Sequence, residues 1–195
     1  MILFRDAEAI VLFGPPNSGK GTIGSKLKNT HQSLVKLSTG DLCRQKRKED
    51  PQFDLEFGHV MEAGELLPDD VTLKVFIESW HKLPLEQVPI IDGLPRTLEQ
   101  CFSMRTLFEE RRIHRVITLF VNTSRPVCEC RARKRGREDD SQIKRRLDLY
   151  DEHSPHIQKF LWAYTELIEI CGDPSENIVW SSVQEALELN SVPCV

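Results

Sequence analysis

A glycine-containing loop at residues 14–22 constrains this chain more than any other feature of its sequence. The loop reads Gly-Pro-Pro-Asn-Ser-Gly-Lys-Gly-Thr and follows the apolar run 9–13, so a buried strand, a loop and a helix are expected in that order. Successive backbone N–H groups of such a loop point into one concavity, the helix N-terminus adds the positive end of its dipole, and Lys20 adds a mobile charge. A plain glycine turn would need neither Lys20 nor Thr22. The stretch therefore predicts a phosphate-binding loop.

The loop departs from the commonest phosphate-loop pattern at one position. That pattern has Ser or Thr directly after the lysine, whereas here Gly21 follows Lys20 and Thr22 comes next. The departure does not remove the expected phosphate site. It narrows the kinds of phosphate-loop protein to which this chain can belong.

Composition fits one soluble globular domain that spans residues 1–195. The chain is 39% hydrophobic and 29% charged, and it is long enough for a full core. Its net charge of −4 disfavours general polyanion binding, so no nucleic-acid partner is expected. No apolar run approaches the roughly 20 residues of a membrane span, and the N-terminus lacks the features of a signal peptide. We therefore expect a cytoplasmic protein with no membrane partner.

The six cysteines indicate reduced thiols rather than a metal site. No two of them have the two-residue gap of a zinc knuckle. Cys128 and Cys130 are two apart on an expected helix, so their side chains would point in different directions. No structural zinc is expected.

Apolar runs alternate with segments of helical spacing, which predicts an α/β fold. The runs would form a parallel sheet covered by helices on both faces, with ligands bound beyond the carboxyl ends of the strands. The expected strands are residues 9–13, 34–37, 88–91, 116–121 and 178–180.

Helical spacing is clearest in two segments. One apolar face recurs over residues 71–80, and the aspartates at 69–70 are expected to cap this helix. Another recurs over residues 157–168, with the Ser-Pro pair at 154–155 as its cap and first turn.

Two segments break the alternation of strands and helices. Residues 38–67 join two strands but read mostly as short helices, and residues 131–140 are dense in charge. Both are interpreted as excursions from one core rather than as separate domains.

A second motif follows the run 88–91. Asp92 stands at the end of an expected buried strand, where it would suit contact with Mg²⁺ through water beside a phosphate loop, although strand-end aspartates also cap turns. Arg96 stands on a loop fixed by Pro95, and its planar guanidinium suits a second phosphate.

Motifs in register along the chain resemble the adenylate kinases. They follow the order seen in that family, and the resemblance covers nearly the whole chain. The Gly-Lys-Gly-Thr sequence that ends the phosphate loop is itself the pattern of the family. The matching stretches are residues 14–22, 37–44, 64–68 and 92–96.

This resemblance implies both an architecture and an activity. The architecture is a three-layer P-loop NTPase fold with a five-stranded parallel sheet flanked by helices, a small segment that binds the nucleoside monophosphate (NMP) at 38–67, and a short lid at 131–140. The activity is reversible, Mg²⁺-dependent phosphoryl transfer from ATP to AMP, which gives two ADP. The family also suggests a monomer.

On the donor side, the resemblance implies that the loop holds the ATP phosphates. Thr22 and, through water, Asp92 would hold Mg²⁺, the expected cofactor. Asn17 departs from the glycine usual in the family, and if that position needs a positive φ, Asn is the least costly replacement. The implied ATP-binding residues are Asn17, Ser18, Gly19, Lys20, Gly21, Thr22, Arg131, Arg135 and, by a looser match near the C-terminus, Ser181.

On the acceptor side, Thr39 and Arg44 match family contacts to the AMP base and phosphate, and residues 65–67 match a backbone contact to the adenine. Thr39 could instead be a helix N-cap, and Arg44 could be one solvated base among several. The implied AMP-binding residues are Thr39, Arg44, Glu65, Leu66, Leu67, Gly93, Leu94, Pro95, Arg96, Gln100, Arg137 and Arg146.

Gln100 decides the expected base. It aligns with the glutamine that reads adenine in the family, where related uridylate–cytidylate kinases usually carry Asn in a different local sequence. Thr97 and Gln100 also form the pattern of a capping box, and a glutamine used by its own helix end could not read a base.

The basic run at 131–137 resembles the family lid. Arg135, Arg137 and Arg146 match arginines that surround the transferring phosphoryl, and with Lys20 they form the implied catalytic set. A solvated face or a nucleic-acid patch is the plainer interpretation of this basic run. The negative net charge of the chain disfavours the nucleic-acid patch. Only Gly136 separates Arg135 from Arg137, so the lid is too short to be the longer, zinc-binding form.

Two other functions stay open from the sequence. One is an NMP kinase for another base, such as a uridylate–cytidylate kinase, and the other is a nucleotide-binding module without turnover. A missing lysine or lid arginine would suggest the second, and none is missing. No histidine lies in the motifs, and no strong general base is needed, because the acceptor is a phosphate oxygen that is already anionic.

Overall fold

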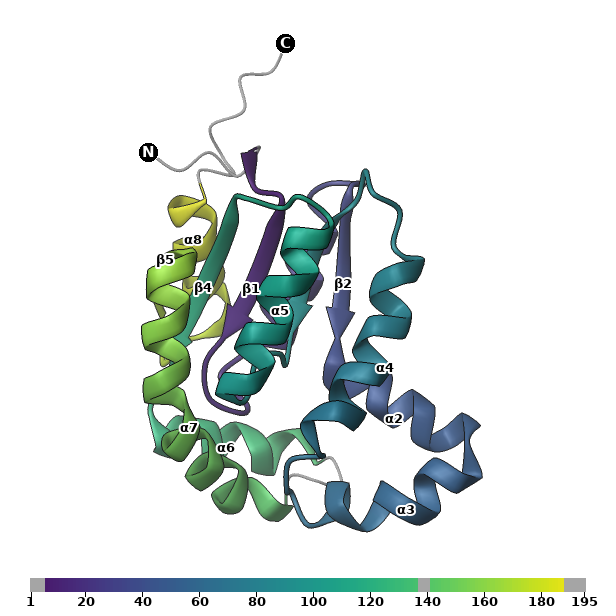
Figure 1. Ribbon diagram of the computed structural model, residues 1–195. Coiled ribbons are helices and arrows are strands. Elements are labelled where there is room, and N and C mark those ends of the chain that lie inside the picture. Colours follow the sequence, from purple (N-terminus) through teal and green to yellow (C-terminus); the bar gives the residue numbers. More distant parts are fainter. Residues whose placement is uncertain (1–5, 137–140, 188–195) are drawn as a thin grey trace.

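The computed structural model describes residues 6–136 and 141–187, and it contains a five-stranded parallel sheet (Figure 1). The strands lie in the order β2-β3-β1-β4-β5, so the strand before the phosphate loop is central. The α/β fold predicted from the alternating pattern is confirmed. The strands are β1 (Ala9–Phe13), β2 (Leu34–Ser38), β3 (Val88–Asp92), β4 (Val116–Asn122) and β5 (Glu166–Cys171).

The fifth strand is not the one expected from the sequence. Residues 178–180 lie inside helix α8 (Glu176–Ala186), and β5 begins within the end of the helical face that was expected over residues 157–168. The prediction of a strand at 178–180 is therefore wrong. Val179 and Val183 are buried one helical turn apart, which explains why this apolar run folds as a helix.

Helices cover both faces of the sheet, and the side chains of β1 explain how. Ala9, Val11 and Phe13 pack with α4 (Asp69–Lys82), α5 (Leu98–Glu110) and α7 (Ile143–Tyr164). Ile10 and Leu12 point to the other face and pack with α1 (Lys20–Lys28) and α8. The alternation of strand side chains thus produces three layers, which Figure 1 shows with α5 and α7 in front of the sheet.

Helix α7 begins earlier than its predicted cap. It runs for 22 residues and carries Pro155 in its interior, so the pair at 154–155 is not a helix start. Ser154 is buried within the helix instead. Proline removes one backbone donor, and this long helix accommodates it.

The aspartates at 69–70 also differ from their predicted role. Pro68 is the N-cap residue of α4, and Asp69 and Asp70 lie in the first turn, where a negative charge favours the helix dipole. The side chain of Asp69 contacts other residues, which are described with the site.

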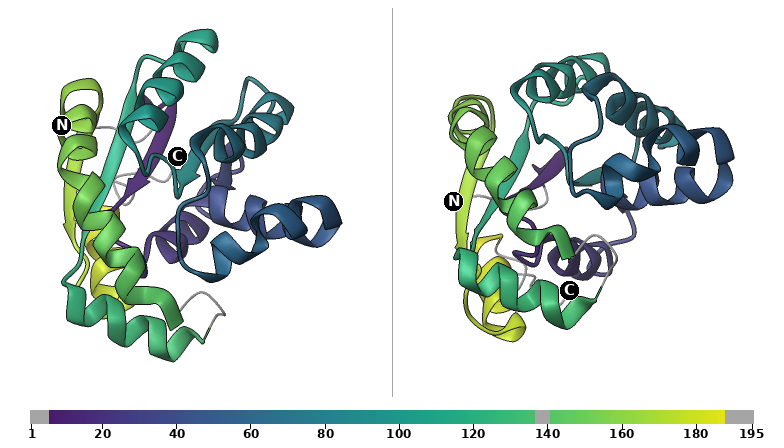
Figure 2. Two further views of the ribbon diagram at one scale, coloured as in Figure 1. Left: turned by 60° about the horizontal axis from the view of Figure 1, so that its bottom comes forward. Right: turned by 90° about the horizontal axis from the view of Figure 1, so that it is seen from below.

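The segment at 38–67 is helical, as expected. It contains α2 (Thr39–Glu49) and α3 (Pro51–Glu62), which form a small core of their own with α4 around Cys43, Phe53 and Val75. Helix α6 (Arg125–Arg135) follows β4 and packs on α7. Figures 1 and 2 place α2 and α3 on one side and α6 on the other, beyond the carboxyl ends of the strands. In the described part of the chain, no helix is both long and apolar enough to cross a membrane.

Candidate active site

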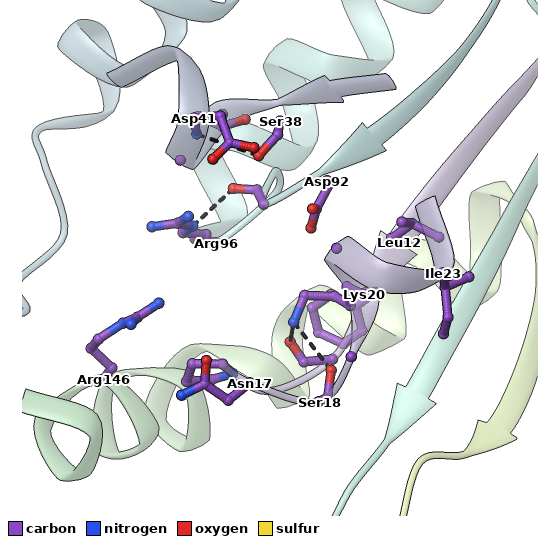
Figure 3. Close-up of a pocket in the computed structure, with 18 of the residues that line it drawn as sticks. Leu12, Asn17, Ser18, Lys20, Ile23, Ser38, Asp41, Asp92, Arg96 and Arg146 are labelled. Atoms are coloured by element: carbon purple, nitrogen blue, oxygen red, sulfur yellow. Dashed lines mark hydrogen bonds between the residues drawn. The ribbon is translucent and has the colours of Figure 1, made fainter. Parts of the chain in front are cut away.

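A cavity of about 1000 Å³ lies at the carboxyl end of the sheet. Its walls come from the loop after β1, the segment 38–67, the loop after β3, and helices α6, α7 and α8. This volume is at the upper end of the range for a single small-ligand pocket, so it has room for more than one ligand. Figure 3 shows side chains from these separate elements directed into one space.

The phosphate loop has the backbone that its sequence predicts. Asn17 has a φ of 63°, so the residue that departs from the family glycine does occupy a left-handed position. Gly14 has a φ of 141°, and a Cβ atom there would lie 2.4 Å from the carbonyl oxygen of Val121. The loop therefore passes too close to β4 for any side chain at position 14.

Lys20 lies at the centre of the loop. Its Nζ donates to the carbonyl oxygens of Gly14 and Pro15 at 2.8 and 2.6 Å and to the hydroxyl of Ser18 at 3.2 Å. Burial lowers the pKa of Lys20 to about 8, and the carboxylate of Asp92 acts against that shift. An anionic phosphate beside the amine would favour its charged form in the same way.

Asp92 and Thr22 both line the cavity, and both carry side-chain oxygen atoms. The register of β1 and β3 pairs Leu12 with Asp92, which brings this carboxylate next to the phosphate loop. Carboxylate and hydroxyl oxygens are the hard donors that Mg²⁺ prefers, and both residues line the cavity. The two side chains therefore fit a Mg²⁺ ion bound together with a nucleotide phosphate.

Lys36 was not singled out from the sequence, yet it belongs to this site. Its Nζ donates to the carbonyl oxygen of Gly21 at 2.9 Å and lies 3.5 Å from Oδ2 of Asp92. The alternation of β2 could have placed it on the cavity side, but only the sheet order brings β2 next to β3. Asp92 thus has the amine of Lys36 on one side and the amine of Lys20, in the phosphate loop, on the other.

A second cationic group lies across the cavity from the loop. The Nε of Arg96 donates to the carbonyl oxygen of Gly93 at 2.8 Å, and Gly93 has a φ of 87°. Arg96 and Arg146 reach toward the same space from opposite walls (Figure 3). Pro95 lines the cavity, whereas Leu94 is 1% exposed and packs in the core. The proposed contact of Leu94 with AMP therefore cannot come from its side chain as it lies here.

The side chain of Gln100 is not used up by its own helix end, which was the alternative that its sequence left open. Its backbone N–H donates to the hydroxyl of Thr97 at 3.2 Å, as in a capping box. Its side chain does not complete that box. Instead, Oε1 accepts from the backbone N–H of Arg96 at 2.7 Å, and Nε2 donates to Oδ1 of Asp69 at 2.6 Å. The amide is buried, and it lines the cavity.

Thr39 and Arg44 lie at the start of α2. The N-cap of that helix is Ser38, which accepts from the backbone N–H of Asp41, so Thr39 is not the cap. The Oγ1 of Thr39 is buried in the cavity wall without a hydrogen-bond partner among the described residues. Such an atom is costly unless a ligand satisfies it. Arg44 lines the cavity and pairs with Asp41 at 2.5 Å.

The stretch 65–67, at the end of the segment 38–67, lines the cavity. Glu65 forms a two-point ion pair with Arg145, whose Nε and Nη2 donate to its two carboxylate oxygens at 2.6 and 2.9 Å. This pair joins the end of the segment 38–67 to the first turn of α7, one residue before Arg146.

The lid arginines are only partly covered by the structure. Arg131 and Arg135 line the cavity, and Arg137 lies outside the described residues. The guanidinium of Arg131 donates to the carbonyl oxygens of Ser18 and Pro174 at 3.0 and 2.9 Å. It therefore ties the phosphate loop to the turn before α8.

Ser181 is not among the residues that line the cavity. It is exposed on α8, and its hydroxyl donates to the carbonyl oxygen of Asn177 in the same helix. The expectation for Ser181 came from a loose family match near the C-terminus, and its side chain does not reach the cavity here. This wall of the cavity is formed instead by Ser175, Glu176, Val179 and Trp180.

Comparison with known proteins shows similarity over most of the chain. The family model described as adenylate kinase matches residues 12–165. The chain is 30% identical to an adenylate kinase of Azobacteroides pseudotrichonymphae, over 92% of this chain and 96% of that protein. It is 31% identical to the adenylate kinases of Maricaulis maris and Thermus thermophilus, again over 92% of this chain and over 98% and 97% of those proteins.

Proposed function

Because the chain belongs to the adenylate kinase family and is a phosphotransferase of the NMP kinase type, we propose that its cavity binds ATP and AMP together and transfers a phosphoryl group between them. One observation carries this proposal. The phosphate loop with Lys20 and the cationic group around Arg96 face the same cavity from different elements, so two phosphate chains can be held end to end.

The donor site is the phosphate loop. Its backbone N–H groups and Lys20 hold the ATP phosphates, and residues 17–22 all line the cavity. Arg131 and Arg135 border the same end. When bound with ATP, Mg²⁺ neutralises phosphate charge, and Thr22 and Asp92 are the side chains proposed to hold it, Asp92 through water.

The acceptor site is the wall formed by the segment 38–67 and the loop after β3. Arg44 and Arg96 hold the AMP phosphate, since a guanidinium matches phosphate geometry. Gln100 reads the base, and residues 65–67 contact it through the backbone. The Oγ1 of Thr39, which has no partner among the described residues, supports a ligand at this wall.

Catalysis in this site is positioning and charge stabilisation. The nucleophile is an AMP phosphate oxygen, which is anionic near neutral pH, so no residue has to remove a proton from it. Lys20, Arg135 and Arg146 surround the phosphoryl group in transfer, together with Arg137 from outside the described residues. The segment 38–67 and the short lid at 131–140 exclude water, which is the competing nucleophile.

Substitution of the two phosphate anchors tests these assignments. Loss of one such charged contact costs about 10²–10³ in rate, so Lys20→Ala and Arg96→Ala should each lower kcat/KM at least that far in a coupled assay with ATP and AMP. Lys74, exposed on α4, provides a control, and Lys74→Ala should keep the wild-type rate. Near-wild-type turnover in either site variant would contradict the proposal.

A further inference from the structure

The carboxylate of Asp69 holds two groups at the start of α5. Its Oδ1 accepts from Nε2 of Gln100 at 2.6 Å, and its Oδ2 accepts from the hydroxyl of Thr97 at 2.8 Å. Asp69 is distant from Gln100 in sequence and belongs to a different helix, α4. Both oxygens of one carboxylate are therefore used on residues of the acceptor wall.

These contacts leave the Gln100 amide only one orientation. A carboxylate can only accept, so it must face the NH₂ group, and the backbone N–H of Arg96 can only donate, so it must face Oε1. The side chain is 1% exposed, which removes water as an alternative partner. The amide therefore has two anchors with opposite requirements.

Among the described residues, each polar atom of the amide has one hydrogen-bonding position beyond its contact with Asp69 or Arg96. Nε2 keeps its second N–H, and Oε1 keeps its second lone pair. This donor and acceptor side by side match the edge of adenine, which presents an amino group next to a ring nitrogen. Hypoxanthine carries a carbonyl oxygen in place of that amino group, and it would set an acceptor against Oε1.

We propose that Asp69 is a positioning residue for base selection, which fixes the Gln100 amide in the orientation that accepts an amino-bearing base. The inference rests on the proposed function, in which Gln100 reads the acceptor base. Without Asp69, the amide keeps a single anchor at Arg96, and Nε2 is free to turn toward a carbonyl-bearing base.

The neighbouring Asp70 provides a matched control. It lies in the same first turn of α4 and offers the same charge to the helix dipole, but it is exposed. A role of Asp69 that came only from its charge at the start of α4 would be shared by Asp70. Asp69→Asn provides a second comparison, because its amide oxygen can still accept from Nε2.

The experiment measures kcat and KM of the full chain with AMP and with inosine monophosphate (IMP), at saturating ATP. For Asp69→Ala we expect the KM for AMP to rise about tenfold and the AMP-to-IMP ratio of kcat/KM to fall by a similar factor, since one hydrogen bond to a charged group is lost. The KM for ATP and the kcat at saturating AMP should stay within about threefold of wild type. Asp70→Ala should keep the wild-type ratio, and Asp69→Asn should recover most of it.

An unchanged AMP-to-IMP ratio in Asp69→Ala, or an equal change in Asp70→Ala, would overturn the inference while the proposed function stands. Wild-type protein that transfers no phosphoryl to AMP would overturn the proposed function itself. If Asp69→Ala does not fold, Asp69→Ser is measured instead, because its hydroxyl is too short to reach Gln100. The same loss of selectivity is expected there, and a wild-type ratio in Asp69→Ser would contradict the inference.

Discussion

The backbone at Asn17 lies in the left-handed region, where most residues other than glycine are strained. Asn is tolerated there better than other non-glycine residues, so this position keeps the loop shape although it lacks the family glycine. Asn17→Ala should lower the free energy of unfolding by about 1–2 kcal/mol. Asn17→Gly should stay within about 1 kcal/mol of wild type, because glycine removes the strain but gains freedom in the unfolded chain. Urea unfolding measures both, and equal stability of Asn17→Ala and wild type would show that the position is not strained.

Individual residues of the site could be predicted where a motif fixed their positions. Contacts between residues on different helices or strands were harder to predict. The sequence indicated that Asn17 would suit a left-handed position if the loop needed one, and the structure shows that it does. The contact of Gln100 with Asp69, and that of Lys36 with Asp92, join residues on separate helices and strands. Nothing in the local sequence near Gln100 indicates which acceptor its amide faces.

At the scale of elements, the four strands predicted at residues 9–13, 34–37, 88–91 and 116–121 were found, and the errors lie in the C-terminal third. Short apolar runs do not distinguish a strand from a buried helix. The burial of Val179, Val183 and Leu187 at intervals of four is helical spacing, and it was the available signal for α8. Pro155 suggested a helix start because proline favours the first turn, but here it lies in the interior of α7.

The contact that secures the start of β1 predicts a pH dependence of stability. Glu8 accepts from the backbone N–H groups of Arg115 and His114, and these bonds hold its pKa below the ordinary value of 4.5. A lowered pKa in the folded state means that the contribution is present above 4.5 and is lost as the pH falls through the folded value. Glu8→Gln should therefore be less stable than wild type at pH 7, by less than about 1 kcal/mol because the site is exposed. The difference should vanish at low pH, and a difference that grows on acidification would contradict the assignment.

The ion pair between Glu65 and Arg145 predicts a coupling between two walls of the cavity. It joins the end of the NMP-binding segment to α7, so Glu65→Gln should raise the KM for AMP about twofold to fivefold, the range for an exposed pair. The charge exchange Glu65→Arg with Arg145→Glu should recover part of that loss. High salt should bring wild type close to the single variant, because exposed charges are screened. A KM insensitive to both the variant and salt would show that the pair does not support the acceptor wall.

At the scale of the whole molecule, the sheet order explains why distant motifs form one site. Strands β2, β3 and β1 are neighbours, so the residues that follow them, Thr39, Gly93 and Gly14, meet at one edge of the sheet. Helices α6 and α7 add arginines from the other side. The family resemblance predicted this assembly. Without it, the residues predicted an α/β protein with a phosphate loop, with Asp92 suited to Mg²⁺ and Arg96 suited to a second phosphate.

The central claim is that one cavity joins ATP to AMP. The most direct test is a coupled assay of the purified protein with ATP, Mg²⁺ and each of AMP, UMP, CMP and GMP as acceptor. The account predicts rapid formation of ADP with AMP and a much lower kcat/KM with the other three. Faster transfer to UMP or CMP than to AMP, or binding of nucleotides without any transfer, would contradict it.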